Sequence, residues 1–243
     1  MISKNQLKLI RQLGQKKYRK QYNQYLVQGE KNVLELLNSP LKAVDIFATQ
    51  AFINTHQNQF PEVDFTPAEE ESLTKASTLV SNNAAIAVVD MPEADLPKNT
   101  GLILALDGVS DPGNLGTIIR VADWYGIQHI VTSTDSADAY NPKTISATMG
   151  SFVRVSVSQV ELPEYLQTLN MPIYGAFLDG QSVHTTDLSA KGVLLMGSES
   201  HGIREQCAKL VSEKITIPAF GEAESLNVAM ATGIILDNFK RQA

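Results

Sequence analysis

The stretch LILALDGVSDPGNLGTIIRVADWYGI at residues 102–127 decides the fold. A short apolar run ends at Asp107, a turn rich in Gly and Pro follows, and apolar residues with helical spacing begin at Leu115. The same alternation of a short strand and a helix continues to the end of the chain, and it predicts a sheet of parallel strands. Because such sheets bind ligands at the carboxyl ends of their strands, we expect the functional residues in the loops there.

Two domains are predicted, one at residues 1–95 and one at residues 101–243. In the second, strands are expected at residues 102–106, 129–132, 153–157, 173–177, 193–196 and 214–217, and helices are expected to begin near Leu115, Pro142, Leu162, Ile203 and Ser225. Before them, short apolar runs separated by polar turns predict a small α/β domain that ends in a strand at residues 85–89. The polar, proline-flanked residues 92–100 then form the predicted linker.

The composition is that of a folded globular protein. The chain has 243 residues, of which 43% are hydrophobic and 19% charged, and this length suits two domains better than one. The first residues lack the apolar core of a signal peptide, and no run approaches the roughly 18 apolar residues of a membrane span, so we expect a cytoplasmic protein. The single Cys207 excludes an internal disulfide and a metal site built from several cysteines.

Positive charge is concentrated at the start of the chain. The net charge is −6, yet residues 1–31 hold eight of the 20 Lys and Arg residues and one acid, Glu30. Tyr18, Tyr22 and Tyr25 are interleaved with these cations. Such a basic arm can bind phosphates while its rings stack on unpaired bases, but a solvated basic helix whose tyrosines pack on their own domain would have the same composition.

Three short strings follow predicted strands, namely NLGTIIR (114–120), GSESHG (197–202) and IPAFGEAESLNVAMATG (217–233). Asn114 stands where it can cap a helix, and Arg120, four residues after Gly116, lies on the same face of that helix as Gly116. Glu199 is expected at a helix start, where the dipole favours a carboxylate. Ser225 is expected to cap the last helix, with Asn227 in its first turn. Capping and surface ion pairing alone can explain each of these residues singly.

In this order, the three strings resemble the signature motifs of the SpoU-TrmH family of RNA 2′-O-ribose methyltransferases, which belongs to the SPOUT superfamily. The resemblance implies an α/β protein whose parallel-sheet domain, residues 101–243, contains a deep trefoil knot. Residues 1–95 would form a small α/β RNA-binding domain similar to a ribosomal protein, and LVQGEKNVLELL (26–37) resembles its usual opening. A homodimer is also implied, in which the Arg of the first motif approaches the partner's cofactor.

The resemblance assigns a site that uses S-adenosyl-L-methionine and no metal. It implies that the catalytic residues are Asn114, Arg120, Glu199, Ser225 and Asn227, and that Gly197, Ile217 and Leu226 contact the cofactor. Arg120 would lie beside the target ribose. Since guanidinium groups stay protonated in proteins, binding phosphate and stabilising the forming alkoxide suit it better than general-base catalysis. Ala219 departs from the family, which usually has a larger apolar residue there, often Met.

Rival interpretations remain open at this point. The resemblance implies a structured RNA substrate, and ribosomal RNA is favoured over transfer RNA because a preceding domain is usual among the ribosomal enzymes of the family. A ribosome-assembly factor that binds RNA without catalysis would not need all five catalytic residues, and an enzyme acting on a free nucleotide would leave the basic arm unexplained.

Asp107 and Asp111 suit helix and turn caps better than Mg²⁺ binding, and we expect His201 to be an exposed loop residue.

Overall fold

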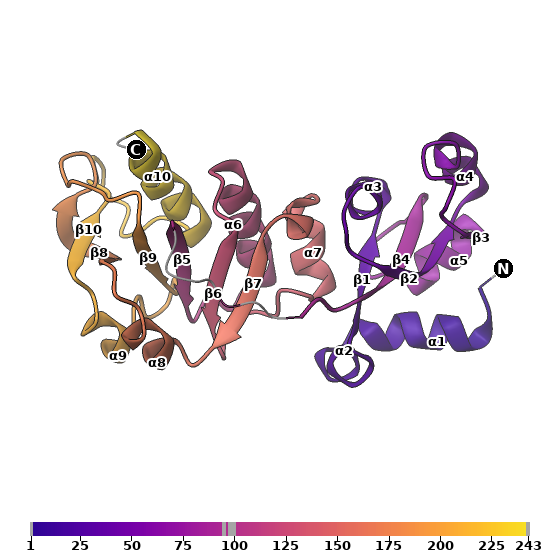
Figure 1. Cartoon of the computed structure of the whole chain (residues 1–243), viewed down its shortest axis with the longest axis horizontal. Helices are drawn as coiled ribbons and strands as arrows, with labels where there is room; N and C mark the ends of the chain where they lie inside the picture. The colour runs from indigo at the N-terminus through magenta and orange to yellow at the C-terminus, as the bar shows by residue number, and fades with distance from the viewer. Residues whose placement is uncertain (1, 94–95, 97–100, 242–243) are drawn as a thin grey trace. The chain divides into compact units, whose positions relative to one another are not determined.

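The computed structural model describes residues 2–93, 96 and 101–241 and contains two compact units (Figure 1). The first unit comprises the chain up to Glu93 together with residues 138–153, and the second comprises residues 94–137 and 154–243. Most of the predicted linker, residues 92–100, lies outside the described residues.

The first unit is a mixed four-stranded sheet between two layers of helices. Its strand order is β1-β4-β2-β3, with β4 antiparallel to both neighbours and β3 parallel to β2. The strands are β1 (Gln24–Gln28), β2 (Ala43–Ala48), β3 (Phe65–Pro67) and β4 (Ala85–Asp90). The helices are α1 (Lys4–Leu13), α2 (Lys16–Tyr22), α3 (Glu30–Leu37), α4 (Gln50–His56), α5 (Glu70–Ala76) and α7 (Pro142–Thr148).

The side chains of β1 point alternately to the two faces of this sheet, and helices cover both faces. Tyr25 and Val27 lie in one core cluster with side chains of α3 and α4, whereas Leu26 lies in the other with side chains of α1 and α5. Successive strand residues point to opposite faces, so the continuous apolar run of β1 fits a strand that is buried on both sides.

The basic arm is part of this unit and not a separate extension. Ile10 and Leu13 of α1 are fully buried, and both pack in the core cluster beneath the sheet. Arg19 is 1% exposed and Tyr25 is buried in the core, so neither is available to RNA. The stacked rings of Tyr18 and Tyr22, 6.4 Å apart, remain at the surface of the arm.

Residues 138–153 pack with the first unit, although the sequence placed them within the domain at residues 101–243. Ile145 of α7 is buried in the core cluster that contains Tyr25, and the ring of Phe152 lies edge-on to Tyr25 at 6.4 Å. Residues 151–153 form a short 3₁₀ helix in this packing. For that reason the strand expected at residues 153–157 begins three residues later.

The second unit is a six-stranded sheet in the order β10-β8-β9-β5-β6-β7, and every neighbouring pair is parallel. The strands are β5 (Leu102–Asp107), β6 (His129–Ser133), β7 (Ser156–Val160), β8 (Ile173–Ser182), β9 (Gly192–Gly197) and β10 (Glu213–Thr216). The predicted α/β class and parallel sheet are confirmed.

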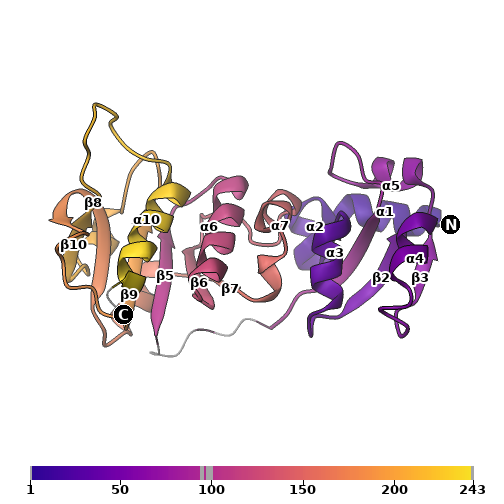
Figure 2. The same cartoon turned by 90° about the horizontal axis from the view of Figure 1, so that it is seen from above.

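Helices cover both faces of this sheet. They are α6 (Pro112–Trp124), α8 (Leu162–Gln167), α9 (Glu205–Ala208) and α10 (Val228–Arg241). Apolar residues of α8 and α9 share a core cluster with Ile103, Ala105 and Val193, and α6 packs beside α10 over the opposite face (Figure 2). In the part of the chain that the structure describes, no helix is long and apolar enough to cross a membrane.

The buried charge of Arg19 gives a prediction for the stability of the first unit. Its Nη2 and Nε donate to Asp138 at 2.6 and 3.2 Å, and its Nη1 donates to the Leu13 carbonyl at 2.9 Å. Because Arg19→Ala leaves the Asp138 carboxylate without this partner, we expect it to lower the free energy of unfolding by about 3–5 kcal/mol in urea titrations. Lys20→Ala, at an exposed position of the same helix, should stay within about 0.5 kcal/mol of the parent. Equal stability of the two variants would contradict this account of Arg19.

Candidate active site

The three motif strings meet at one edge of the parallel sheet of the second unit. Parallel strands end at the same edge, where the loops that follow them come together. The loop after β5 leads to Asn114, the turn after β9 contains Glu199, and the loop after β10 leads to Asn227. Residues that are more than 80 positions apart in sequence are thereby brought into contact.

At the first motif, the helix cap is Asp111 and not Asn114. The helix α6 begins at Pro112, three residues earlier than predicted, and Asp111 Oδ1 accepts a hydrogen bond from the Asn114 backbone N–H at 2.8 Å. Proline suits this first position, since its missing N–H would be unpaired there anyway. Asn114 thus lies in the first turn, and its side-chain amide is available for other contacts.

At the second motif, Glu199 lies in a tight turn and not at the start of a helix. Ser198 and Gly202 form an antiparallel bridge whose backbone hydrogen bonds are 2.9 and 3.2 Å long, and α9 begins only at Glu205. Gly197 is required by this turn, because a Cβ there would lie 2.1 Å from the Gly202 carbonyl carbon. Its lack of a side chain therefore has a local packing cause in addition to any role toward a ligand.

At the third motif, the last helix is capped by Asn227 and not by Ser225. The helix α10 begins at Val228, and Asn227 Oδ1 accepts from the backbone N–H groups of Ala229 and Met230 at 3.0 and 3.4 Å. Ser225 is exposed in the preceding loop. The helix is shorter than predicted because Asn227 has the better cap position, two and three residues before these unpaired donors.

A chain of side-chain hydrogen bonds joins the three motifs. Asn227 Nδ2 donates to Asn114 Oδ1 at 3.0 Å, and Asn114 Nδ2 donates to Glu199 Oε1. The Asn227 amide therefore uses its oxygen for the helix cap and its nitrogen for Asn114. This arrangement fixes the orientation of both amides and directs the Glu199 carboxylate toward the start of α6.

A pocket of about 880 Å³ lies against this chain of contacts. The three residues expected to contact a cofactor, Gly197, Ile217 and Leu226, all line it, and so do Glu199 and Ser225. Its size falls within the range of pockets for small ligands and cofactors. The charged residues in its described lining are Asp179, Glu199 and Glu224, so its formal charge is negative. Lys214, 3.5 Å from Asp179, offsets part of this charge at the rim.

Arg120 is not brought to the contacts of Asn114, Glu199 and Asn227. It is exposed on α6, does not line the pocket, and forms no hydrogen bond or ion pair with other described residues through its side chain. Six residues along a helix correspond to a rotation of about 240°, so Arg120 and Asn114 point in different directions from α6. Trp124, one helical turn beyond Arg120, is 84% exposed.

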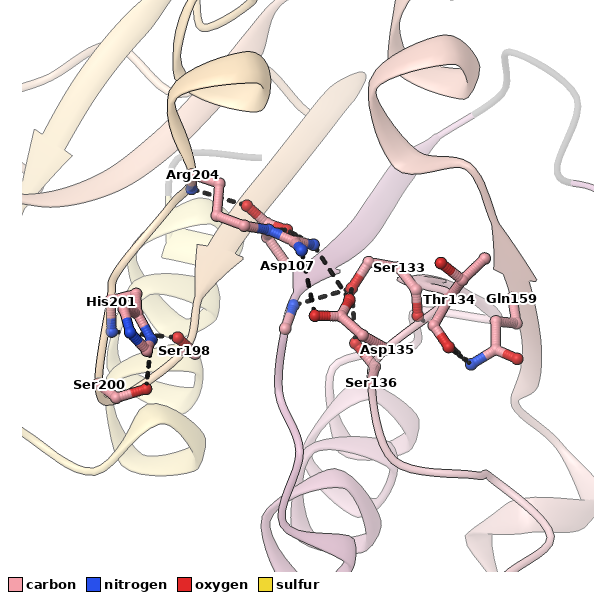
Figure 3. Close-up of polar contacts among 11 residues, drawn as sticks. Asp107, Ser133, Thr134, Asp135, Ser136, Gln159, Ser198, Ser200, His201 and Arg204 are labelled. Atoms are coloured by element: carbon pink, nitrogen blue, oxygen red, sulfur yellow. Dashed lines mark hydrogen bonds and ion pairs between the residues drawn. The ribbon is translucent and has the colours of Figure 1, made fainter. Parts of the chain in front are cut away.

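A second polar cluster joins the ends of β5, β6 and β9 (Figure 3). Its centre is Arg204, whose guanidinium contacts two carboxylates, those of Asp107 and Asp135. The hydrogen bonds that Arg204 donates to Asp107 raise the pKa of Arg204, and the hydrogen bond that the Ser133 hydroxyl donates to Asp135 lowers the pKa of Asp135. Arg204 and Asp135 are not among the residues predicted from the sequence, because nothing in one sequence shows which acid an Arg 97 positions away will contact.

The remaining candidates have ordinary structural roles. Asp107 pairs with Arg204 and Asp111 caps α6, which leaves neither as a free ligand for Mg²⁺. His201 is exposed, and its Nδ1 lies 2.7 Å from Ser200 Oγ at the edge of the pocket. Cys207 is buried, and burial raises the pKa of its thiol to about 12, so it stays protonated and unreactive.

Two family models match the chain. The model of the SpoU rRNA Methylase family matches residues 101–237, and that of the MRM3-like substrate binding domain matches residues 4–87. The first match includes all three motif strings, and the second includes most of the first unit.

Similar proteins match most of the chain or a large part of it. The 23S rRNA (guanosine(2553)-2′-O)-methyltransferase RlmP of Bacillus subtilis (strain 168) is 31% identical, over 96% of both chains. RlmB of Escherichia coli (strain K12), a 23S rRNA (guanosine-2′-O-)-methyltransferase, is 32% identical over 63% of this chain and 65% of that protein.

Solved structures match as well. A TrmH-family structure from Porphyromonas gingivalis is 36% identical and covers 100% of both chains with a TM-score of 0.90. An AdoMet-bound rRNA methyltransferase from Sinorhizobium meliloti is 27% identical, with a TM-score of 0.86 over 99% of this chain and 97% of that one.

The two possible caps of α10 can be separated by stability measurements. Asn227→Ala removes the side-chain oxygen that accepts from the first turn, so we expect the free energy of unfolding to fall by about 0.5–2 kcal/mol. Ser225→Ala should change it by less than about 0.5 kcal/mol, because Ser225 is an exposed loop residue. If Ser225→Ala were the more destabilising change in urea titrations, the assignment of Asn227 as the cap would be wrong.

Proposed function

Because the chain belongs to the SpoU rRNA methylase family, we propose that it transfers a methyl group from S-adenosyl-L-methionine to a ribose 2′-oxygen of ribosomal RNA. The observation that carries this proposal is the contact among Asn114, Glu199 and Asn227 beside a pocket lined by the residues expected to hold the cofactor. A chain that used this fold only to bind RNA would have no need to hold these three side chains together at a pocket.

The pocket lining suits S-adenosyl-L-methionine. Met196, Ile217 and Leu226 provide apolar surface for a nucleoside, while Glu199 and Glu224 favour a positively charged ligand. When bound, the cofactor supplies a methyl group on a cationic sulfonium. A dinucleotide such as NAD would instead place phosphates in a pocket whose described lining contains carboxylates and no Lys or Arg. The related Sinorhizobium meliloti enzyme is bound to AdoMet, which supports the same assignment.

The residues of the site act mainly by positioning. An in-line displacement requires the attacking oxygen, the methyl carbon and the leaving group to be aligned, and such alignment is worth up to about 7–11 kcal/mol. Asn114 and Asn227 hold each other's amides and the Glu199 carboxylate in fixed orientations. We propose that these three side chains and Ser225 orient the ribose, and that Gly197, Ile217 and Leu226 contact the cofactor.

We propose that Arg120 acts in a homodimer, at the site of the partner chain. Arg120 is directed away from the contacts within its own chain, as the helical rotation from Asn114 requires, and the 84% exposed Trp124 lies on the same face of α6. Met230 on the neighbouring α10 is 62% exposed. We propose that a second copy of the chain covers these apolar side chains. Arg120 would thereby reach the partner's site, where it binds phosphate and stabilises the forming alkoxide.

The RNA contact is proposed for the first unit. Residues 4–87 match a substrate-binding domain model, and the exposed lysines of α1 and α2 accompany the stacked Tyr18 and Tyr22. Lys17 Nζ lies 4.5 Å from the centre of the Tyr18 ring. Such a surface can hold backbone phosphates and stack a base. Relatives named as 23S rRNA methyltransferases favour ribosomal over transfer RNA.

The finer features of the fold remain proposals. We propose two domains, residues 1–95 and 101–243, with the packing of residues 138–153 against the first unit as a departure from this simple division. The deep trefoil knot is proposed for the second domain. Its support is that the turn after β9 and the loop after β10 line the same pocket at the edge of a fully parallel sheet. Cytoplasmic location remains a prediction.

Methyl transfer to purified RNA tests the proposed function. The protein is incubated with S-adenosyl-L-methionine labelled in its methyl group and with ribosomal RNA from cells that lack the gene. We expect label in a 2′-O-methylated nucleoside after digestion of the RNA. Label in a methylated base, or binding of both RNA and cofactor without any transfer, would reject the proposal, and the second result would favour a non-catalytic assembly factor.

Arg120 gives the sharpest prediction about the proposed chemistry. Arg120→Ala should lower methyl transfer by at least about 100-fold, because an interaction with charge that develops in the transition state is lost. Arg120→Lys should also fail, since a point charge does not reproduce the planar guanidinium. The dissociation constant for S-adenosyl-L-methionine, measured by calorimetry, should change less than about threefold. Near-normal turnover of either variant would remove Arg120 from the mechanism.

The RNA contact of α1 and α2 is tested with three exposed lysines. Changing Lys16, Lys17 and Lys20 to Glu should weaken RNA binding and reduce its salt dependence by roughly one unit of slope per lost phosphate contact. Arg19 is kept, because it is buried. Changing the exposed Lys42, Lys191 and Lys209 to Glu gives the same net charge and should leave the slope nearly unchanged. Equal slopes for both triple variants would place RNA recognition elsewhere.

A further inference from the structure

We propose that Arg204 is a positioning residue of the active site, which sets the distance between Asn114 and Glu199 through its ion pair with Asp107. This inference rests on the proposed function, because it concerns the same site. Arg204 does not line the pocket, so any effect on the reaction must act through other residues.

Arg204 donates hydrogen bonds to both carboxylate oxygens of Asp107. Arg204 Nε donates to Asp107 Oδ1 at 2.7 Å, Nη2 donates to the same oxygen, and the Arg204 backbone N–H donates to Oδ2 at 2.8 Å. The Asp107 side chain is buried, with 0% exposure. Since both backbone and side chain of Arg204 participate, the ion pair fixes the path of the chain at Arg204 and not only the position of its guanidinium.

The two residues of this ion pair lie at the ends of the two loops that carry Asn114 and Glu199. Asp107 is the last residue of β5, and the loop that follows it reaches the Asp111 cap and Asn114. Arg204 lies two residues after Gly202, whose bridge with Ser198 closes the turn that contains Glu199. Only short segments of chain connect Asp107 to Asn114 and Arg204 to Glu199. A shift at the ion pair will therefore change the geometry of the Asn114–Glu199 contact.

A second carboxylate, that of Asp135 two residues after the end of β6, also contacts the guanidinium. Arg204 Nη1 and Nη2 donate to Asp135 at 3.0 and 3.1 Å, and Ser133 Oγ donates to Asp135 at 2.7 Å (Figure 3). The Gly108 backbone N–H, in the loop after β5, donates to Ser133 Oγ at 2.9 Å. The ends of β9, β5 and β6 are thus joined by one guanidinium and one hydroxyl.

This arrangement requires a guanidinium and not merely a positive charge. The planar fork of Arg204 serves Asp107 through Nε and Nη2 and Asp135 through Nη1 and Nη2. A lysine ammonium is a single point charge and cannot make this set of contacts in fixed directions. Arg204→Lys therefore retains the charge beside the buried Asp107 but loses the orientation.

The test compares Arg204→Lys with Arg154→Lys. Arg154 also forms a bidentate ion pair in the second unit, with its Nε at 3.1 and 3.0 Å from the two oxygens of Asp123. We expect Arg204→Lys to lower kcat per folded molecule by about tenfold or more, since small misplacements at an active site have large effects. Hydrogen exchange of residues 198–203 and 108–114 should become faster. Arg154→Lys should keep kcat within about twofold and leave exchange in these segments unchanged.

A double-mutant cycle with Glu199→Gln separates positioning from mere stability. If Arg204 acts through Glu199, Arg204→Lys in the Glu199→Gln background should lower kcat by less than about twofold further. If Arg204 only stabilises the fold, kcat per folded molecule will be normal in Arg204→Lys, and this result overturns the inference. Equal losses in both backgrounds would also overturn it. A parent protein without methyl transfer would instead reject the proposed function, while the exchange measurement would still test the ion pair.

Discussion

The site depends on one constraint, that all six strands of the second sheet run in the same direction. Their carboxyl ends therefore lie at one edge, and the three loops that carry the motifs have to meet there. A separate local feature then fixes the conformation of each loop. Asp111 caps α6, Gly197 permits the tight turn after β9, and Asn227 caps α10.

The place of the pocket follows from how the strands are ordered. The first strand of this sheet is β5; the chain then adds β6 and β7 on one side of it and returns to add β8, β9 and β10 on the other, so the order reverses between β5 and β9. In open α/β sheets, a ligand usually binds at such a reversal. Here an ion pair between Asp107 and Arg204 bridges the ends of these strands, and the pocket is formed by residues of β8, β9 and the loop after β10. We infer that the ion pair gives rigidity at the reversal while the neighbouring strand ends bind the ligand.

Much of the fold of the second unit could be predicted from the sequence, because the patterns that indicate strands and helices are local. Strand and helix order in the second unit follows from apolar periodicity, and the predicted strand at residues 102–106 differs from β5 by one residue. Helix starts were less accurate. The sequence predicts Asn114 and Ser225 as caps, although Asp111 and Asn227 have better positions relative to the unpaired N–H groups. The errors matter for function, since they decide which polar atoms are free for the site.

Long-range partners could not be predicted. The burial of Arg19 against Asp138 and the contact of Arg204 with Asp107 join residues 119 and 97 positions apart, and a single sequence carries no signal for such pairs. Charge counting treated Arg19 as one of many cations of a basic arm, whereas packing makes it part of the core of the first unit. The family resemblance predicts the candidate catalytic residues, and the structure adds the contacts that hold Asn114, Glu199 and Asn227 together.

The central claim is that this site methylates a ribose of ribosomal RNA. The most direct measurement is a map of 2′-O-methylated positions across total RNA from cells with and without the gene. The account predicts that one ribosomal RNA position loses its methyl group when the gene is deleted and regains it when the gene is restored. An unchanged ribosomal RNA map, or a loss confined to transfer RNA, would contradict it.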